Sequence, residues 1–504
     1  MHTGRKPNCP EARLRVLNGH PVKPDGKYVL YWMNAARRVR WNYALDHAVQ
    51  LATELQKPLI VLEALRCGYP FASDRIHQFV LQGMLDNQAA LERTDVHYYP
   101  YVESTVGAGK GLLRNLAQSA CCVVTDDSPA TFLPRMTAAA ASQALVRMEA
   151  VDSNGVLPMA EAGRAFHRAY DFRRFLQRRL APHLAQPPKR DSVTGAKLRR
   201  LRGLPGPITK RWPVATPSLL NAKPHSLRTL PIDHEVSGTN LRGGASEGRK
   251  LLQRFTREPQ GLANYGAGRN HPDQASTSGL SPFLHFGHIS SHEVLHAVQQ
   301  QEGWTPENIR PLRSGARNGW WGMSEASEGF LDQLITWREL GLNFAAHRDD
   351  IQSFDSLPDW ARNTLDQHSA DPRPHTYSLA EFDCAATHDP LWNAAQTELR
   401  ESGRMHNYLR MLWGKKILHW SPSPRAALGV MLELNDRYAL DGRDPNSYSG
   451  IFWVLGRYDR AWGPERPVFG KVRYMSSKNT RRKLRLADYL RQWGSEDQCS
   501  LFPA

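Results

Sequence analysis

The segment Tyr28-Val-Leu-Tyr-Trp-Met33 is an uninterrupted run of aromatic, β-branched and aliphatic residues, which is typical of a strand buried on both faces. Four later segments share this character, and they cover residues 58–62, 96–102, 121–124 and 146–151. Segments with a helical period of apolar residues lie between them, so strands and helices alternate along the chain. This alternation predicts an α/β N-terminal domain with a Rossmann-like, doubly wound parallel sheet and helices on both faces.

A glycine cluster, Gly107-Ala-Gly-Lys-Gly111, lies between a predicted strand and a predicted helix, where a phosphate-binding loop would be expected. The cluster does not match GxGxxG, because Leu112 occupies the position of the third glycine, and it does not match GxxxxGK[ST]. We therefore interpret it as a flexible turn and predict no dinucleotide there.

The composition is that of a basic globular protein of 504 residues, which allows roughly two to four domains. No run of 18 apolar residues predicts a membrane span, and the first 26 residues contain no apolar stretch of the secretory type. The six cysteines are scattered, which favours a reducing, intracellular compartment. Sixty-five Lys and Arg against 49 Asp and Glu give a net charge of +16, which favours a polyanionic partner and nucleic acid first.

Changes in composition divide the chain into four predicted parts. These are a basic N-terminal arm at 1–26, the α/β domain at 27–186, a basic Pro/Gly-rich connection at 187–249, and an all-helical C-terminal domain at 250–504. Between residues 187 and 211 the connection carries eight Lys and Arg against one Asp. Such a segment is either a solvated connection or a contact to the DNA backbone.

The segment His292-Glu-Val-Leu-His296 matches the HExxH zinc motif, which places two imidazoles one helical turn apart beside a general base. A zinc hydrolase using His292, Glu293 and His296 is therefore one hypothesis. No HxxGxxH extension supplies a third ligand, so we favour a surface helix of a basic, His-rich protein and predict no metal site.

Several motifs in the second half resemble the photolyase and cryptochrome family, and within it the class II cyclobutane pyrimidine dimer (CPD) photolyases. They are TSGLSPFLHFG at 277–287, WREL at 337–340, MHNYLRMLWGKKILHW at 405–420, LDGRDPNSY at 440–448, THDPLWNAA at 387–395 and FGKVRYM at 469–475. The resemblance runs from about residue 27 to residue 490. It implies an α/β antenna domain, a long connection and a helical domain that binds FAD.

The resemblance also implies a set of FAD contacts. Arg410 and Asp441 resemble the family's ion pair beside the flavin ring, and Asn435 matches the asparagine that class II enzymes place at flavin N5. The serines and threonine opening a helix suit a pyrophosphate, because a helix N-terminus carries unpaired N–H donors. The full set implied is Tyr265, Thr277, Ser278, Leu280, Ser281, Arg338, Asn407, Arg410, Asn435 and Asp441.

Three tryptophans resemble the class II chain that reduces the flavin. Trp413 would be nearest to the flavin, Trp392 would follow, and Trp420 would be outermost. Trp413 and Trp420 are seven residues apart, which on a helix is two turns and about 10.5 Å on one face. Such a stripe by itself is more often core packing.

The resemblance further implies a pocket for a dimer flipped out of DNA, as photolyases are base-flipping enzymes. Trp337 and Trp453 would form its aromatic walls, Met411 would lie against the bases, and Arg473 would contact a phosphate.

The sequence departs from the class II pattern at two places. Gln333 occupies the position where class II members usually carry a glutamate that contacts the dimer, so we expect weaker stabilisation of the electron-bearing base. The loop from Trp453 to Trp462 is one residue shorter than the Gly-Gly-containing loop of class II members, so we expect a different shape at the border of the dimer pocket.

The function implied by the resemblance is that of a light-driven DNA repair lyase, in which photoexcited reduced, anionic FAD passes an electron to the dimer in UV-damaged DNA. A cryptochrome-like photoreceptor without repair activity is the main alternative. For the α/β domain the resemblance leaves open a deazaflavin, a folate, another antenna chromophore or none, and no residue is assigned to such a group. We expect a monomer without membrane association, which is cytoplasmic and nucleoid-associated in a bacterium and nuclear or organellar in a eukaryote.

Overall fold

The computed structural model describes residues 9–311 and 313–494, and the chain forms two compact units that are each discontinuous in sequence. Unit 1 comprises residues up to 163, 178–253 and 279–309, and unit 2 comprises 164–177, 254–278 and 310 onward. The boundaries predicted from composition at residues 186 and 249 remain predictions.

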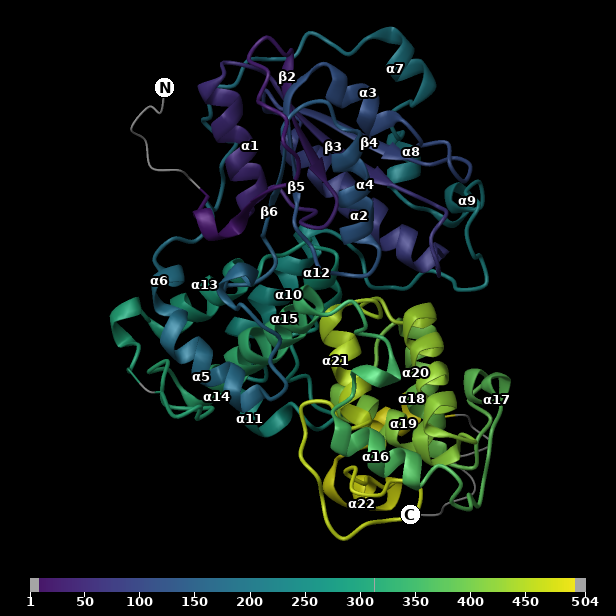
Figure 1. The fold of residues 1–504 in the computed structure, drawn as a ribbon. Helices are drawn as coiled ribbons and strands as arrows, with labels where there is room; N and C mark the ends of the chain where they lie inside the picture. The colour runs from purple at the N-terminus through teal and green to yellow at the C-terminus, as the bar shows by residue number, and fades with distance from the viewer. Residues whose placement is uncertain (1–8, 312, 495–504) are drawn as a thin grey trace. The chain divides into compact units, whose positions relative to one another are not determined.

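Unit 1 is built on a six-stranded sheet with the order β1-β6-β5-β2-β3-β4. The strands are β1 (Leu14–Val16), β2 (Tyr28–Met33), β3 (Leu59–Leu65), β4 (His97–Val102), β5 (Ala120–Asp126) and β6 (Met148–Val151). All neighbouring pairs among β2–β6 are parallel, which confirms the predicted Rossmann-like sheet (Figure 1). Only β1 is antiparallel, and it pairs with β6 at the edge of the sheet.

The pairing of β1 corrects one prediction. Residues 1–26 were expected to form a basic arm, but Leu14 lies opposite Val151 in the sheet, and Arg13 is buried. The Arg13 guanidinium donates hydrogen bonds to three carbonyl oxygens that follow β6, those of Asp152, Gly155 and Val156. This part of the segment is therefore integrated into unit 1. Residues 1–8 of the predicted arm lie outside the described residues.

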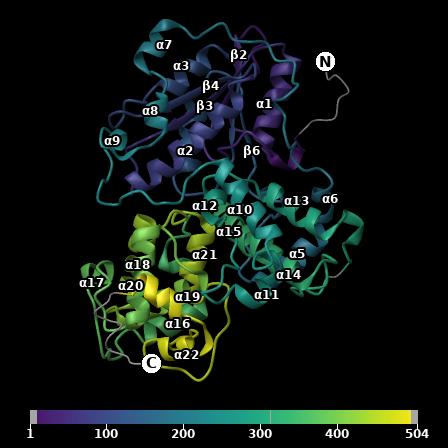
Figure 2. The same ribbon diagram turned by 180° about the vertical axis from the view of Figure 1, so that it is seen from behind.

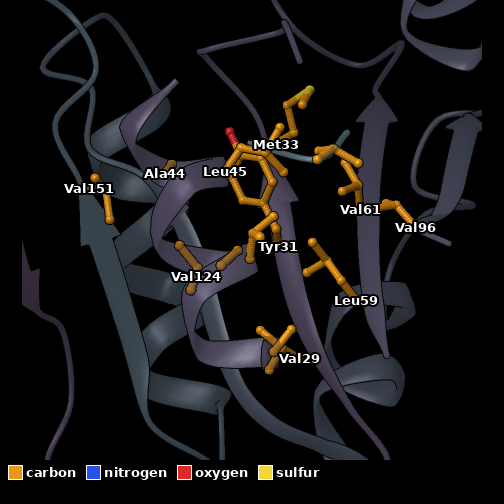
Figure 3. Close-up of a cluster of buried hydrophobic side chains, with 14 of the residues drawn as sticks. Val29, Tyr31, Met33, Ala44, Leu45, Leu59, Val61, Val96, Val124 and Val151 are labelled. Atoms are coloured by element: carbon orange, nitrogen blue, oxygen red, sulfur yellow. The ribbon is translucent and has the colours of Figure 1, made fainter. Parts of the chain in front are cut away.

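Both faces of the sheet are buried. Successive side chains of β2 point to opposite sides, and each set packs against helices. Val29, Tyr31 and Met33 pack with α1 (Tyr43–Glu54), and Figure 3 shows this cluster. Leu30 and Trp32 pack with α3 (Leu112–Gln118) and α4 (Leu133–Gln143) on the other face. The continuous apolar run of β2 is thus explained by its central place in a two-sided sheet.

The glycine cluster after β4 is a turn, as predicted, and a carboxylate of the chain already occupies it. The backbone N–H groups of Gly107 and Gly109 both donate to Glu103 Oε1, at 2.9 and 3.1 Å. Gly107 and Gly111 have positive φ values of 88° and 90°, which favour glycine at these positions. Donors that would otherwise face a phosphate are therefore used within the protein.

The basic connection packs on unit 1 instead of lying free in solvent. Its apolar residues join the two clusters on the sheet, among them Val193, Leu198, Leu201, Leu204, Ile208 and Trp212. Its basic residues Lys189, Arg190, Lys197, Arg199, Arg200, Arg202, Lys210 and Arg211 are exposed. Three short helices lie within it, α7 (Gly206–Arg211), α8 (Pro217–Leu220) and α9 (Pro224–Leu227).

Unit 2 is helical, which confirms the predicted fold class of the C-terminal domain. The structure describes no strand in residues 250–311 or 313–494. Its helices include α14 (Glu325–Leu331), α15 (Arg338–His347), α16 (Asp359–Gln367), α18 (Pro390–Ser402), α19 (Asn407–Trp420), α20 (Pro424–Tyr438) and α21 (Pro445–Val454). Helix α19 contacts α18, α20 and α21, and the four lie together in both views (Figures 1 and 2). No helix among the described residues is long and apolar enough to cross a membrane.

Candidate active site

Asp-Pro pairs define the start of two helices that carry predicted site residues. Asp389 caps α18, and its carboxylate accepts hydrogen bonds from the backbone N–H groups of Leu391 and Trp392. Asp444 caps α21 in the same way. An acidic cap followed by proline in the first turn is a strong start signal, since proline lacks the N–H that a first turn cannot use. These caps place Trp392 in the first turn of α18 and Trp453 in the last turn of α21.

The three tryptophans of the predicted electron chain are buried together between α18 and α19. Trp392, Trp413 and Trp420 are 0 %, 2 % and 1 % exposed. The Trp392 indole N–H donates to the Trp413 carbonyl oxygen at 3.0 Å, and the Trp392 and Trp420 rings meet edge to face with centroids 6.0 Å apart. The Trp413 indole N–H donates to Gln396 Oε1 at 2.9 Å. The structure therefore links the three tryptophans, called the indole cluster below, through Trp392, which bonds the Trp413 backbone and meets the Trp420 ring. Their role in electron transfer remains a prediction.

A second cluster joins three of the residues predicted to contact the flavin. Arg410 of α19 forms an ion pair with Asp441 at 3.1 Å, and its other terminal nitrogen lies 3.5 Å from Ser447 Oγ. Ser447 in turn donates to Asn435 Oδ1 at 3.1 Å. Ser447 links the ion pair to the amide, and it was missed by the sequence analysis because a serine within a helix carries no signal of its own.

The orientation of the Asn435 amide follows from its neighbours. Its Nδ2 donates to the Gly442 carbonyl oxygen at 2.7 Å and to Asp436 Oδ1 at 3.0 Å, so Oδ1 must point toward Ser447. Gly442 approaches α20 so closely that a Cβ there would lie 2.4 Å from the Asn435 carbonyl oxygen. The hydrogen bond to the Gly442 carbonyl and the close approach of Gly442 therefore fix the Asn435 amide. Its oxygen accepts one hydrogen bond from Ser447 and keeps a second lone pair for another donor.

This donor and acceptor set fits a reduced flavin. A ring held as its anion needs a fixed positive charge and N–H donors nearby, which Arg410 supplies, and an acceptor for a ring N–H, which Asn435 Oδ1 supplies. Arg410 and Asp441 are largely shielded, with side chains 14 % and 12 % exposed, so their fields are weakly screened.

The other predicted cofactor residues occupy varied environments. Tyr265 is buried in unit 2 between Phe255 and Phe330, with the Arg269 guanidinium 5.4 Å from its ring centre. Arg338 is buried in unit 2, while Asn407 and Thr277 are exposed and Ser278 is half-buried. Leu280 and Ser281 belong to unit 1, where Leu280 caps the short helix α12 (Ser281–His285).

Gln333 and Trp337 lie on a π-helical segment, η5 (Asp332–Trp337). Gln333 and Trp337 are half-buried, whereas the other four residues of the segment are buried. Both side chains therefore lie on the more accessible side of the segment. π-Helical turns are uncommon and are frequent at functional sites. No sequence pattern indicated this segment in advance.

A buried ion pair anchors the start of this segment. Arg173 of α5 (Ala169–Arg179) binds Asp332 through two hydrogen bonds of 2.7 and 3.1 Å, and both side chains are 5 % exposed. Arg173 also donates to the Gly315 carbonyl oxygen. The pair fixes the residue directly before Gln333.

Arg173→Ala is expected to lower the free energy of unfolding by about 3–5 kcal/mol, because it leaves the Asp332 carboxylate buried without its partner. Chemical denaturation followed by circular dichroism measures this loss. The neighbouring exposed Arg174→Ala is the matched control and should change stability by about 0.5 kcal/mol or less. Equal effects of the two substitutions would contradict the anchoring role of Arg173.

Two basic side chains lie close to the Trp453 ring. The Lys415 ammonium is 5.3 Å from the Trp453 ring centre, and the Arg473 guanidinium is 5.7 Å from it. Lys415 is completely buried and donates to the Val454 carbonyl oxygen, and burial lowers the pKa of its ammonium to about 7. Arg473 is exposed and also lies 4.8 Å from the ring of Trp462. Met411 is half-buried on α19, on the side that faces Gly450 of α21.

The HExxH segment lies in unit 1 on α13 (Ser291–Glu302), and its environment does not suit zinc. His292 is buried edge-on against Tyr43, and burial lowers the pKa of its imidazole, with Arg13 and Arg38 nearby. His296 packs against Trp41. No group of three or more His, Cys, Asp or Glu that could hold a metal ion occurs among residues 9–311 and 313–494. The zinc hydrolase hypothesis therefore gains no support.

Comparison with known proteins identifies the family. The chain is 35% identical over 485 residues to the deoxyribodipyrimidine photo-lyase of Methanothermobacter thermautotrophicus, which covers 95% of this chain and 97% of that protein. The chain belongs to the photolyase family. The deoxyribodipyrimidine photo-lyase of Potorous tridactylus is a second relative of this family, 31% identical over 97% of this chain and 85% of its own length.

Among solved structures, a bacterial class III photolyase from Agrobacterium tumefaciens matches with a TM-score of 0.64 and 17% identity, over 93% of this chain and 86% of that chain. That likeness supports the photolyase fold. No family model matches the chain. Membership of the photolyase family rests on full-length similarity, so it extends over both units.

Proposed function

We propose that this chain is a class II CPD photolyase, a light-driven DNA repair lyase that splits cyclobutane pyrimidine dimers in UV-damaged DNA. Its full-length similarity to proteins named deoxyribodipyrimidine photo-lyase supports the reaction. Arg410, Asp441, Ser447 and Asn435 form what we call the flavin-type cluster. The observation that carries the proposal is that one helix, α19, holds both Arg410 of this cluster and Trp413 of the indole cluster. The flavin-type cluster and the indole cluster are thus connected by one helix, on which Arg410 and Trp413 are three positions apart.

FAD bound in reduced form beside Arg410 and Asn435 would supply, on excitation by blue light, the electron for opening the cyclobutane ring. Arg410, held by Asp441, places positive charge where the flavin anion would lie. Asn435, fixed by Gly442 and Ser447, offers an acceptor for a ring N–H. Trp413, Trp392 and Trp420 would carry electrons toward an oxidised flavin held there.

The dimer is bound outside the DNA stack, since its reactive bond cannot be reached within a duplex. Trp337 and Trp453 are half-buried aromatic residues that form its walls, with Met411 against the bases. Arg473 is exposed beside Trp453 and neutralises a backbone phosphate. The net charge of +16 supports binding to DNA by release of counterions.

The remaining features of the proposal follow the family resemblance. The protein acts as an intracellular monomer, and the α/β domain carries a deazaflavin or folate antenna. The second candidate function is a cryptochrome-like photoreceptor that photoreduces its flavin and leaves dimers intact. Gln333, which lacks the acidic proton of the usual glutamate, is the observation in its favour.

An absorbance time course tests the proposal. Reduced protein is mixed with UV-irradiated oligothymidine and exposed to blue light, with a dark sample as the control. Recovery of thymine absorbance in the light alone is the expected result. Flavin photochemistry without thymine recovery would favour the photoreceptor, and failure to bind added FAD would overturn the entire assignment.

Gln333→Glu is expected to raise the quantum yield of dimer splitting at unchanged affinity for damaged DNA. An amide donates a hydrogen bond to a base carbonyl, but only a carboxylic acid also offers a proton to the electron-bearing base. The yield is measured under limiting photons with the flavin fully reduced. Gln333→Ala should lower the yield below that of the natural chain, and an unchanged or lower yield for Gln333→Glu would contradict this account.

A further inference from the structure

The last helix that the structure describes, α23 (Ala487–Trp493), is held in place by other segments of unit 2. It has seven residues, which is too short for a helix to be stable alone in water. Its own N-cap residue, Leu486, makes no side-chain cap hydrogen bond. The Asp273 carboxylate takes that place, since it accepts the backbone N–H groups of Tyr489 at 2.8 Å and Asp488 at 3.2 Å. The start of α23 therefore depends on a carboxylate from a distant part of the chain.

The segment that contains Asp273 makes a second contact with the chain leading into α23. The Arg485 backbone N–H donates to His271 Nδ1 at 3.2 Å. His271 and Asp273 lie between Tyr265 and Thr277, in the part of unit 2 that carries predicted FAD residues. The two contacts therefore tie the C-terminal helix to a segment with an expected role in cofactor binding.

A carboxyl group of α18 holds the other side of α23. Tyr489 is 5 % exposed, and its hydroxyl donates to Glu398 Oε2 at 2.7 Å. The same oxygen accepts the backbone N–H of His406 at 3.1 Å. His406 is the N-cap residue of α19, so Glu398 joins α23 to the start of the helix that carries Asn407 and Arg410.

The electrostatics of Glu398 place it near the flavin-type cluster. Burial raises the pKa of its carboxyl, whereas the hydrogen bond from Tyr489 and, more weakly, the charge of Arg410 lower it. Burial lowers the pKa of the His406 imidazole to about 4, and its contact with the Arg269 backbone opposes that shift. The segment of Arg269, the start of α19 and the helix α23 therefore meet at one place in unit 2.

We propose that α23 is a latch on the FAD site, and that Asp273 and Glu398 are the positioning residues that hold it closed. The inference deepens the proposed function and rests on its assignment of FAD to unit 2. One segment held by the latch leads to Thr277 and Ser278, which would bind the pyrophosphate, and the other carries Arg410, which would lie beside the flavin ring. A cofactor bound by both segments leaves only when they separate, so α23 must detach first.

The construction of α23 suits an element that opens and closes while the rest of the fold stays intact. Local opening is easiest at short terminal elements with few buried contacts, and α23 is such an element. Its closed state depends on a small number of identifiable hydrogen bonds, chiefly those to Asp273 and Glu398. Each bond can therefore be removed singly, and the rate of FAD release should report its loss.

The test is the rate at which FAD leaves the holoenzyme in the dark, followed by the rise in flavin fluorescence after dilution. Tyr489→Phe keeps the ring but removes the bond to Glu398, so release should become roughly 5- to 150-fold faster. Asp273→Ala removes the cap of α23 and should accelerate release roughly 2- to 30-fold. In hydrogen exchange on the natural chain, FAD should protect the backbone N–H groups of α23, because a ligand that requires the closed latch also favours it.

Tyr438→Phe is the matched control, since Tyr438 is a buried tyrosine of the same unit that hydrogen-bonds a different carboxyl group, that of Asp383. It should leave the release rate unchanged. Release at the natural rate in Tyr489→Phe or Asp273→Ala, equal acceleration in Tyr438→Phe, or no protection of α23 by FAD would each overturn the latch and leave the proposed function intact. Failure of the natural chain to bind added FAD would overturn both, whereas dimer splitting by the natural chain separately decides the repair function.

Discussion

Trp392→Phe is expected to abolish photoreduction of the flavin, reducing its rate to that of free flavin in the same reductant. Trp392 is fully buried, bonds the Trp413 carbonyl oxygen and touches the ring of Trp420, so it is the central member of the indole cluster. Phenylalanine fills much of the same volume but is not oxidised under these conditions, so the chain is interrupted without a large cavity. Steady blue-light reduction of oxidised flavin, followed by absorbance, measures the effect.

The same variant should split dimers normally once its flavin has been reduced chemically with dithionite. This contrast separates loss of the electron chain from loss of fold or of substrate binding. A variant that photoreduces at the natural rate would remove Trp392 from the pathway. A variant that fails in both assays would show that Trp392 is needed for the fold or for substrate binding, and not specifically for electron transfer.

The arrangement of residues along helix α19 explains why one substitution can affect flavin photoreduction without affecting dimer splitting. Its 14 residues span about 21 Å and are buried on several sides, because α18, α20 and α21 all contact it. Arg410 lies in its first turn, Trp413 follows near its middle, and Trp420 is its last residue. The helix therefore carries Arg410 of the flavin-type cluster at one end and the buried Trp420 at the other.

The sheet of unit 1 was predictable from sequence because its central strands are continuous apolar runs, and such runs are distinctive in a two-sided sheet. The edge strand β1 was not predictable. Its three residues Leu14, Arg15 and Val16 are too short and too mixed to show a period, and only pairing with β6 gives them a structure. The connection likewise lacks periodicity, because its apolar residues pack at irregular intervals on an existing surface.

The candidate site was predictable where function requires particular residue types at fixed spacings, as for Trp413 and Trp420 on one helix or Arg410 and Asp441 in recognisable motifs. It was not predictable where contacts arise from tertiary structure alone. Ser447 bridges Arg410 and Asn435 only because α19, α20 and α21 converge.

Trp453→Ala is expected to remove most of the preference for damaged DNA. Stacking of a base on an aromatic side chain is worth about 1–3 kcal/mol, so the affinity for a dimer-containing oligonucleotide should fall roughly 5- to 140-fold. Affinity for undamaged DNA of the same length should change little, because it depends on phosphate contacts such as the one proposed for Arg473. Fluorescence anisotropy with matched damaged and undamaged oligonucleotides at one salt concentration measures both.

Trp453→Phe is the conservative variant that identifies the cause. It retains a flat ring above the Lys415 ammonium, so it should recover a large part of the lost preference, whereas the alanine leaves that buried cation with the Val454 carbonyl oxygen and no ring. Equal losses for damaged and undamaged DNA in Trp453→Ala would show that Trp453 supports the fold of the loop instead of the dimer. If Trp453→Ala keeps the full preference for damaged over undamaged DNA, Trp453 is not part of the dimer pocket. Trp337 would then be the stacking residue to test.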